Sequence, residues 1–384
     1  MKIAYISFSK IPSREANSIH VMKMCQAFQQ EGHETTLYVP RTGKEHVDLT
    51  ALWHHYGITA PFPLRYISVR RYPFTALKDH MYALKTVFRI RRERTELVYT
   101  RHLYSAMWAS LLGIPTVLEE HSPVQGGKLG KVYVWAMVKG KDFQKLVVIT
   151  HALKQIYPKR FIKDDQIIVA PDGIDLERFE NLPVTGITRM YLDIPYTSFV
   201  AGYSGHLYPG RGLELILNLA ERLSGVIFLI IGGMENDIMN LRTRIKELGL
   251  KNIRLAGFLP NSEMPGYLSA CDVLLMPYQR KVTTVNRNDD TSTWMSPMKM
   301  FEYMAAGRLI ISSDLPVIRE VLNETNAALC IPDDMDAWQH AIEQAVTDKE
   351  WREKHGKQAR QDVEQYTWRR RIQRILSELD IRNK

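Results

Sequence analysis

The sequence contains no long hydrophobic run. No segment approaches the roughly 18 consecutive apolar residues that a membrane-spanning helix requires, so we expect no such helix. The apolar run in the opening segment MKIAYISFSK is also too short for a secretory signal peptide. Both absences predict a protein of the cytoplasm.

Cysteine is scarce as well. Cys25, Cys271 and Cys330 are far apart, odd in number and set in apolar surroundings, so we expect buried thiols of a reducing compartment rather than disulfides. No spacing typical of a zinc site occurs. The G-x-G-x-x-G fingerprint is also missing from the opening loop, which argues against a nicotinamide or flavin cofactor.

Length and composition favour a globular protein with two domains. The chain has 384 residues, of which 45% are hydrophobic and 24% are charged. Its formal net charge of +9 permits anionic partners, which include nucleotides, acidic lipids and nucleic acid.

Strand-like and helix-like patterns alternate along the chain. A helical run at residues 19–30 separates the first two strand-like runs. The strand-like runs lie at residues 2–7, 33–39, 97–100, 116–119, 146–149, 167–169, 198–204, 226–231, 253–256 and 273–276. The alternation predicts two Rossmann-like halves with mostly parallel sheets, in which ligands bind at the carboxyl ends of the strands.

Two strands of the first half end in side chains that can carry chemistry. The strand at 116–119 runs into Glu120 and His121, which places an imidazole where open α/β folds hold their ligands. Arg101 and His102 close the preceding strand and are further candidates. An isolated histidine is often a structural or surface residue, so the residues alone leave the role of His121 open.

A basic amphipathic helix is predicted around residues 77–94. Leu77, Met81, Leu84 and Phe88 recur at helical spacing among lysines and arginines. The helix either packs its apolar stripe on the sheet or rests on anionic lipid, and the pattern is compatible with both.

The segment SPMKMFEYMAAGRLIISSD, residues 296–314, reads as a helix that feeds a buried strand. Ser296 suits an N-cap, Pro297 the first helical turn and Gly307 the end of the helix. Free N–H groups and the helix dipole at such a start make a seat for phosphate. Glu302 lies about one turn inside, where it is either a ligand for sugar hydroxyls or an exposed residue beside a solvated Lys299.

The turn GHLYPGRG, residues 205–212, offers a second seat for phosphate. Its three glycines allow close backbone approach, and Arg211 precedes a predicted helix at 213–223. Without other information, an ordinary strand-to-helix turn is the favoured interpretation. Asp334-Met335-Asp336 matches a D-x-D metal signature, but a helical run follows directly, so we interpret it as a helix cap and expect no metal.

The segment at 296–314 resembles the signature of glycosyltransferase family 4, whose members are retaining GT-B enzymes that use nucleotide sugars. The similarity recurs along the chain, and PDGIDLERF at 171–179 is similar to the family's interdomain segment. The resemblance implies an acceptor-binding domain at 1–180, which includes the C-terminal helix at 366–384. A nucleotide-sugar-binding domain at 181–365 would face it across a cleft.

The resemblance also implies the site residues. It assigns the donor nucleotide to Gly205, His206, Arg211, Gly257, Phe258 and Glu302, the donor sugar to His121, Trp294, Met295, Ser296 and Met298, and catalysis to His121, Arg211 and Lys299.

Three positions depart from the family pattern. Ala16-Asn17-Ser18 stands in place of a glycine pair, and His206 replaces the first of two diphosphate-binding cations. Trp294 replaces a glutamate that normally holds the donor sugar. Its indole either stacks on the sugar or lies outside the site, in which case backbone groups near Met295, Ser296 and Met298 hold the sugar.

The reaction implied is retaining transfer of a hexose from a nucleotide-diphosphate sugar to a glycan or lipid-linked acceptor, in the synthesis of cell-envelope polysaccharide or glycolipid. The departing diphosphate assists as base, and no covalent nucleophile, cofactor or metal is expected. Such an enzyme would be cytoplasmic and could rest on the anionic inner face of the membrane.

Two alternatives remain. A GT-B sugar-nucleotide epimerase would need paired acid and base groups that the sequence does not reveal. A basic nucleic-acid-binding protein would need a basic aromatic platform outside the Rossmann halves. Because the basic residues are interleaved with ordinary core periodicity, we expect no nucleic-acid partner.

Overall fold

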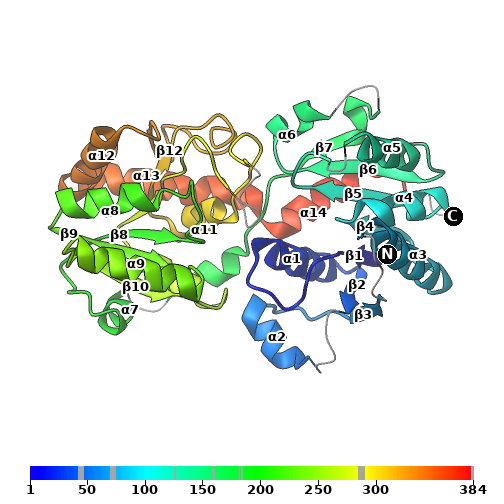
Figure 1. The fold of residues 1–384 in the computed structure, drawn as a ribbon, viewed down its shortest axis with the longest axis horizontal. Coiled ribbons are helices and arrows are strands. Elements are labelled where there is room, and N and C mark those ends of the chain that lie inside the picture. The colour runs from blue at the N-terminus through cyan, green and yellow to red at the C-terminus, as the bar shows by residue number, and fades with distance from the viewer. Residues whose placement is uncertain are drawn as a thin grey trace. The chain divides into compact units, whose positions relative to one another are not determined.

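The computed structural model describes residues 1–41, 47–69, 75–124, 127–157, 161–180, 182, 185–283 and 290–381. The chain divides into two compact units. Unit 1 comprises Met1–Asp172 and Trp368–Lys384, and unit 2 comprises Gly173–Thr367. Each unit is built around one parallel sheet with helices packed on it (Figure 1). The predicted α/β class with two Rossmann-like halves is confirmed.

Unit 1 contains a seven-stranded sheet in the order β3-β2-β1-β4-β5-β6-β7. Its strands are β1 (Lys2–Ile6), β2 (Glu34–Arg41), β3 (Leu64–Ser68), β4 (Leu97–Thr100), β5 (Thr116–Glu120), β6 (Phe143–Val148) and β7 (Ile167–Val169). Its helices are α1 (Ala16–Gln30), α2 (Leu49–Tyr56), α3 (Thr75–Arg92), α4 (Leu103–Leu111), α5 (Gly127–Val138), α6 (His151–Ile156) and α14 (Trp368–Ser377).

The strand order of unit 1 reverses between β1 and β4. β1 pairs with β2 on one side and with β4 on the other, so Ile6 lies opposite both Tyr38 and Thr100. Helices α3, α4 and α5 pack side by side, and buried Tyr82, Val87 and Ile90 of α3 join the core over this part of the sheet. Such a reversal opens a crevice at the carboxyl ends of the strands, where α/β folds bind ligands.

Unit 2 contains a six-stranded sheet in the order β10-β9-β8-β11-β12-β13. Its strands are β8 (Phe199–Ser204), β9 (Val226–Ile231), β10 (Ile253–Gly257), β11 (Val273–Met276), β12 (Leu309–Ser313) and β13 (Ala328–Cys330). Its helices are α7 (Thr185–Tyr191), α8 (Leu213–Arg222), α9 (Glu235–Glu247), α10 (Met264–Ser269), α11 (Met298–Ala306), α12 (Met335–Thr347) and α13 (Lys349–Asp362).

The strand order of unit 2 reverses between β8 and β11, so the crevice of this sheet lies at the ends of these two strands. Residues of α8 and α12 bury their apolar faces on the sheet, with Trp338 fully enclosed. Tyr303 of α11 accepts a hydrogen bond of 2.7 Å from the backbone N–H of Ser204. This bond fixes α11 beside the carboxyl end of β8.

Helix α14 belongs to unit 1 although it ends the chain. It packs against α1, as the red and dark blue helices of Figure 1 show. Arg369 and Gln373 of α14 both donate to the carboxylate of Glu31, which follows α1, at 2.7 Å. Trp368, Ile372 and Ile375 are buried beneath them. The expected return of the last helix to the first domain is therefore confirmed.

Several sequence-based boundaries are corrected by the structure. Helix α11 begins at Met298 with Pro297 as its N-cap, one residue later than predicted, so Ser296 does not cap it. Gly307 ends α11 in the left-handed conformation, as expected. The polar, proline-containing stretch at 181–197, which its composition predicts to be a linker, contains α7. The predicted loop at 282–294 lies partly outside the described residues, which omit 284–289.

The structure bears on the cysteines and on the possibility of a membrane-spanning helix. Cys25, Cys271 and Cys330 are all free and buried, as expected. Among the described residues, no helix is both long and apolar enough to cross a membrane.

Candidate functional site

In unit 2, the turn after β8 holds its glycine in a conformation that other residues rarely adopt. Gly205 has φ of +132°, and a Cβ at this position would lie 2.9 Å from the Nζ atom of Lys299. Gly212, with φ of +83°, forms the N-cap of α8. The positive φ therefore favours glycine at 205, and the absence of a side chain leaves room for the ammonium of Lys299.

Two cations converge at this turn with unused hydrogen-bonding capacity. The Nζ atom of Lys299 lies 4.0 Å from the ring centroid of Tyr203, and the described residues provide no hydrogen-bond acceptor for it. Arg211 donates to the hydroxyl of Tyr278 at 3.0 Å and to Thr283 O at 3.5 Å, whereas its buried Nε has no partner in the described part of the chain.

Burial controls the charge of this cluster. Loss of solvent, reinforced by repulsion from Arg211, holds the pKa of Lys299 well below its usual value. The same causes, together with Lys299, lower the pKa of His206, whose ring stacks on Tyr208 at 4.7 Å. An anion bound here would favour protonated Lys299 and would fill the unused donor of Arg211. The arrangement is suited to a phosphate group.

Glu302 projects from the second turn of α11. Its Oε1 accepts a hydrogen bond of 3.5 Å from Asn261, a residue that also accepts from Arg178 through its backbone carbonyl. Gly257 ends β10 with φ of +70°, and Phe258 is 36% exposed. The structure therefore places Glu302 on the helix that carries Lys299, and Phe258 at the end of a strand of the same sheet.

In the segment before α11, backbone N–H groups already form hydrogen bonds within the protein. The backbone N–H groups of Trp294 and Met295 both donate to Thr291 O, at 3.1 and 2.9 Å. The N–H of Met295 is therefore already engaged within unit 2, and the expectation that backbone groups here hold the sugar stays a prediction. Met295 and Ser296 are buried, whereas Met298, at the start of α11, is partly exposed.

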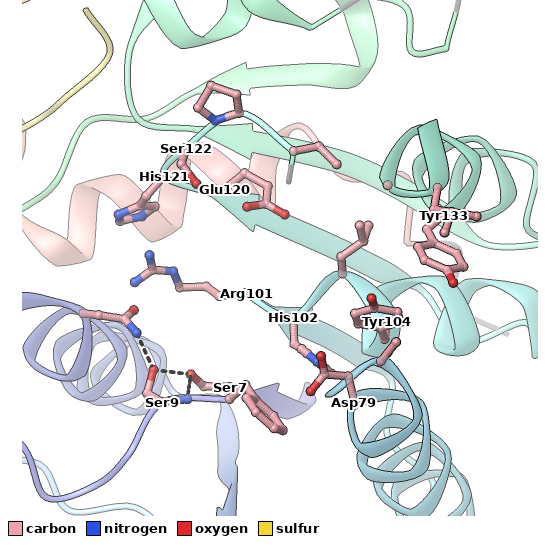
Figure 2. A pocket seen from close by; sticks show the side chains of 18 residues that line it. Ser7, Ser9, Asp79, Arg101, His102, Tyr104, Glu120, His121, Ser122 and Tyr133 are labelled. Carbon is pink, nitrogen blue, oxygen red and sulfur yellow. Dashed lines mark hydrogen bonds between the residues drawn. The ribbon is translucent and has the colours of Figure 1, made fainter. Parts of the chain in front are cut away.

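Unit 1 has its own cavity, of about 560 Å³, at the β1 and β4 strand ends. Figure 2 shows that Arg101, His102, Glu120 and His121 all line it, together with Ser7 and Ser9 from the loop after β1. Asp79 of α3, Tyr104 of α4 and Tyr133 of α5 close the other end. The cavity therefore occupies the point where the strand order reverses.

His121 is held by its neighbour two residues earlier. Its Nε2 lies 2.7 Å from Oε1 of Glu119, a fully buried carboxylate. Burial, Arg101 and His20 lower the pKa of His121 to about 4, so the ring is neutral at physiological pH. An ionised Glu119 requires the proton on Nε2, which leaves the lone pair on Nδ1 as an acceptor.

A buried polar network lies beneath His121. Glu119 accepts from Arg371 of α14 at 2.8 Å and also from the hydroxyl of Tyr99, while Nε2 of His20 lies 2.8 Å from Glu119 Oε1. Nδ1 of His20 lies 2.9 Å from Asp172. Arg371 opposes the effect of burial and holds the pKa of Glu119 well below its usual range. The network thus stabilises an ionised Glu119.

His20, His121 and Asp172 lie close enough for one ligand atom of each to surround a metal ion. However, both nitrogens of His20 already approach carboxylates, and Arg371 supplies the positive charge that Glu119 requires. We therefore assign these residues to the hydrogen-bonded network. At the D-x-D match, Asp334 caps α12 by accepting from Ala337 N at 3.0 Å, as predicted, and Asp336 contacts Arg222 at 2.6 Å.

Glu120 and Arg101 face the cavity without pairing. The described residues form neither a hydrogen bond nor an ion pair with the side chain of Glu120, and the buried NH1 of Arg101 likewise has no partner there. Burial, reinforced by Glu119 and opposed by Arg101, raises the pKa of Glu120 to about 8. Glu120 is thus mostly protonated at neutral pH.

The sequence predicts some of these site residues but not others. His121, Arg101 and His102 do lie together, as expected from their strand ends, and Arg211 and Lys299 meet in unit 2. Glu119, His20, Asp172 and Arg371 were not predicted as a group. The available signal was Glu119 itself, because a carboxylate that precedes a strand end within an apolar run requires a buried partner.

Two family profiles match the chain. The profile described as Glycosyltransferase Family 4 matches residues 18–178, and that described as Glycosyl transferases group 1 matches residues 189–362.

Among curated relatives, the 2-deoxystreptamine glucosyltransferase of Streptomyces kanamyceticus is 23% identical over 224 residues, which cover 51% of this chain and 57% of the relative. TuaH of Bacillus subtilis, assigned to teichuronic acid biosynthesis, is 29% identical over 118 residues, or 30% of this chain and 27% of that protein. The chain thus matches 57% of the length of the first relative and 27% of the length of the second.

Among solved structures, the Anabaena protein HepE in complex with UDP superposes with a TM-score of 0.75 at 15% identity, covering 99% of this chain and all of HepE. HepE has also been crystallised with UDP-glucose. The structural similarity identifies the GT-B fold.

Proposed function

Because the chain belongs to glycosyltransferase family 4, we propose that it transfers a hexose from a nucleotide-diphosphate sugar to an acceptor with retention of anomeric configuration. The observation that carries this proposal is the pair of cations, Lys299 and Arg211, at the glycine turn of unit 2, where the described residues leave the buried Nε of Arg211 without a partner. A diphosphate supplies the oxygens that these donors lack. The UDP complex of HepE supports UDP as the nucleotide.

Departure of the nucleoside diphosphate is the step that these cations assist. As the glycosidic bond to the diphosphate breaks, negative charge grows on the leaving oxygen. Lys299, Arg211 and the N–H groups at the start of α11 stabilise that charge. The diphosphate oxygen then accepts the proton of the acceptor hydroxyl, which attacks from the same face of the sugar.

Glu302 and Trp294 bind the remaining parts of the donor in this proposal. The carboxylate of Glu302 accepts from the ribose hydroxyls, and Gly257 and Phe258 contact the base. Trp294 restricts the sugar by shape. His121 of unit 1 accepts a sugar hydroxyl at Nδ1, which its bond to Glu119 leaves available.

No metal is required in this proposal, because Lys299, Arg211 and the helix ends supply the positive charge beside the diphosphate. Activity should therefore persist in EDTA. A loss of activity in the chelator that manganese or magnesium restores would contradict this part.

The acceptor is a glycan or lipid-linked glycan, and we propose that unit 1 rests on an anionic membrane surface to reach it. Support comes from α5, where Leu129, Val132 and Trp135 are 65%, 53% and 47% exposed and follow helical spacing. Lys128 and Lys131 lie in the same helix. Helix α3 adds Leu77 and Phe88, which are 43% and 52% exposed, among basic residues.

The proposed function is tested by incubating the protein with UDP-glucose, UDP-galactose and their GDP counterparts. Slow hydrolysis or transfer to added glycans should release the nucleoside diphosphate, and proton NMR of the first product should show the α-anomer from an α-linked donor. Release of the β-anomer, or no turnover of any nucleotide sugar, would contradict the proposal.

A further inference from the structure

Arg101 occupies the middle of the cavity in unit 1. It follows β4, and in Figure 2 its guanidinium extends between Glu120 and His121 on one side and Ser9 on the other. The side chain is partly buried, and its NH1 group is inaccessible to solvent. The guanidinium is therefore fixed within the cavity rather than extended into water.

The guanidinium makes no side-chain hydrogen bond or ion pair with the described residues. A buried, charged donor without an acceptor costs free energy, and proteins seldom retain one unless a ligand supplies the acceptor. Glu120 is the carboxyl that could neutralise it, but the two groups lie beyond ion-pair distance. Burial raises the pKa of Glu120 to about 8, so at neutral pH it carries little charge that could compete.

The rest of the cavity is suited to a sugar. Phe8 and His102 stack at 5.0 Å, and the rings of Tyr104 and Tyr133 lie 5.1 Å apart, which provides aromatic faces for C–H groups. Asp79 contributes a buried carboxyl oxygen with no partner in the described part of the chain, which can accept from a hydroxyl. A volume of about 560 Å³ is sufficient for one or two sugar rings.

We propose that this cavity binds an acidic acceptor, whose terminal sugar lies against the aromatic wall while its carboxylate or phosphate pairs with Arg101. Guanidinium groups bind both anions through two parallel hydrogen bonds, so the geometry selects this shared chemistry. The inference rests on the proposed function, because it identifies the class of acceptor for the same enzyme. His121, 20 positions further along the chain, lines the same cavity.

The donor diphosphate is the other anion in the reaction. Lys299 and Arg211 in unit 2 already provide two cations for it, and the described residues leave Nε of Arg211 without a partner. Arg101 is a third such cation and belongs to a cavity lined entirely by unit 1. The anion at Arg101 is therefore assigned to the acceptor.

The test compares ligands that differ in one group. p-Nitrophenyl β-D-glucuronide carries a carboxylate where p-nitrophenyl β-D-glucoside carries a hydroxymethyl group, and glucose 1-phosphate represents the phosphate arm. Dissociation constants are measured by ligand-observed NMR on the full chain. Wild type should bind at least one of the two anions about tenfold or more tightly than the glucoside, as expected for hydrogen bonds to charged groups. The anion that binds more tightly identifies whether the acceptor carries a carboxylate or a phosphate.

Three variants separate charge recognition from general effects. Arg101→Gln should abolish the preference while leaving glucoside affinity unchanged, and Arg101→Lys should retain part of it. Arg91→Gln removes an exposed charge from α3 and should behave like wild type. Since the guanidinium of Arg101 has no protein partner to lose among the described residues, its replacement should not lower the melting temperature.

Titration of UDP into the same samples distinguishes failure of this inference from failure of the proposed function. Equal binding of all three sugars, or a preference that survives in Arg101→Gln, would overturn the acidic acceptor while UDP binding leaves the glycosyltransferase proposal intact. A loss of UDP affinity in Arg101→Gln would assign Arg101 to the donor and also overturn the inference. Absence of nucleotide binding would instead count against the proposed function.

Discussion

The Nε2 atom of His121 lies 2.7 Å from the Oε1 atom of Glu119, and Glu119 is completely buried. The same carboxylate accepts from Arg371, a residue 252 positions later in the chain. Helix α14 therefore contributes to the orientation of a cavity residue that it does not adjoin in sequence. The pair makes the last helix part of the site in unit 1.

Glu119→Gln should destabilise unit 1 because it leaves the guanidinium of Arg371 buried without its charge partner. We expect the free energy of unfolding to fall by about 3–5 kcal/mol, measured by denaturant titration. Glu120→Gln, one residue along the same strand, is the matched control. It should raise rather than lower stability at pH 7, because folding at that pH requires Glu120 to take up a proton that glutamine does not need.

Glu119→Gln should also alter the protonation of His121, because it removes the carboxylate that accepts the hydrogen bond from Nε2. In wild type, nitrogen-15 NMR of labelled histidine should show His121 as the neutral form protonated at Nε2 between pH 5.5 and 8, because its pKa is lowered to about 4. A wild-type ring protonated at Nδ1, or charged at pH 6, would contradict the orientation by Glu119.

Glu120 should make stability depend on pH. Burial raises its pKa from 4.5 to about 8, with Glu119 adding to the shift and Arg101 opposing it. Between these values the folded state retains a proton that the unfolded state has lost, so stability falls as pH rises from 5 to 8. Glu120→Gln should therefore raise the melting temperature at pH 8 and leave it unchanged at pH 4.5. An equal effect at both pH values would contradict the raised pKa.

Trp294→Ala should change the choice of donor sugar without changing affinity for UDP. The indole stands where related enzymes carry a carboxylate, so selection should depend on shape. The measurement compares the kcat/KM ratio for UDP-glucose and UDP-galactose, with Trp135→Ala on the exposed face of α5 as control. If the ratio and the rates match wild type, Trp294 lies outside the donor site.

The proposed membrane face predicts that Leu129→Ser combined with Trp135→Ser reduces co-sedimentation with phosphatidylglycerol vesicles several-fold, since both changes remove exposed apolar surface that lipid would bury. Met239→Ser with Leu248→Ser changes exposed apolar residues of unit 2, in α9 and at its C-cap, and should have no effect. Binding that neither pair affects, or equal binding to neutral phosphatidylcholine vesicles, would argue against this face.

Much of the fold follows from local sequence signals. Val226–Ile231 and Val273–Met276 were predicted at the bounds that the structure has, because apolar pattern and strand length are local properties. Helix α7 was missed since its seven residues lie in a polar, proline-containing stretch. The N-cap of α11 was misplaced by one residue because Ser296 is buried and makes no cap, whereas Pro297 adopts the extended N-cap conformation.

The candidate site was predicted only where strand ends and helix starts bring residues together. Arg101 and His121 follow adjacent parallel strands, so topology alone makes them neighbours. The pairing of Arg371 with Glu119 depends on how α14 docks on α1, which no local pattern encodes. Likewise, the tyrosines at 203 and 278 beside Lys299 look like ordinary core residues in the sequence.

The central claim is that unit 2 binds a nucleoside diphosphate through cations whose donors are otherwise unused. Isothermal titration of UDP into wild type and Lys299→Met tests it most directly, since methionine keeps most of the unbranched side chain and removes its charge. Lys299→Met should lower UDP affinity by about tenfold or more and should not reduce thermal stability, because burial already lowers the pKa of Lys299. UDP affinity that is the same in both proteins would contradict the account.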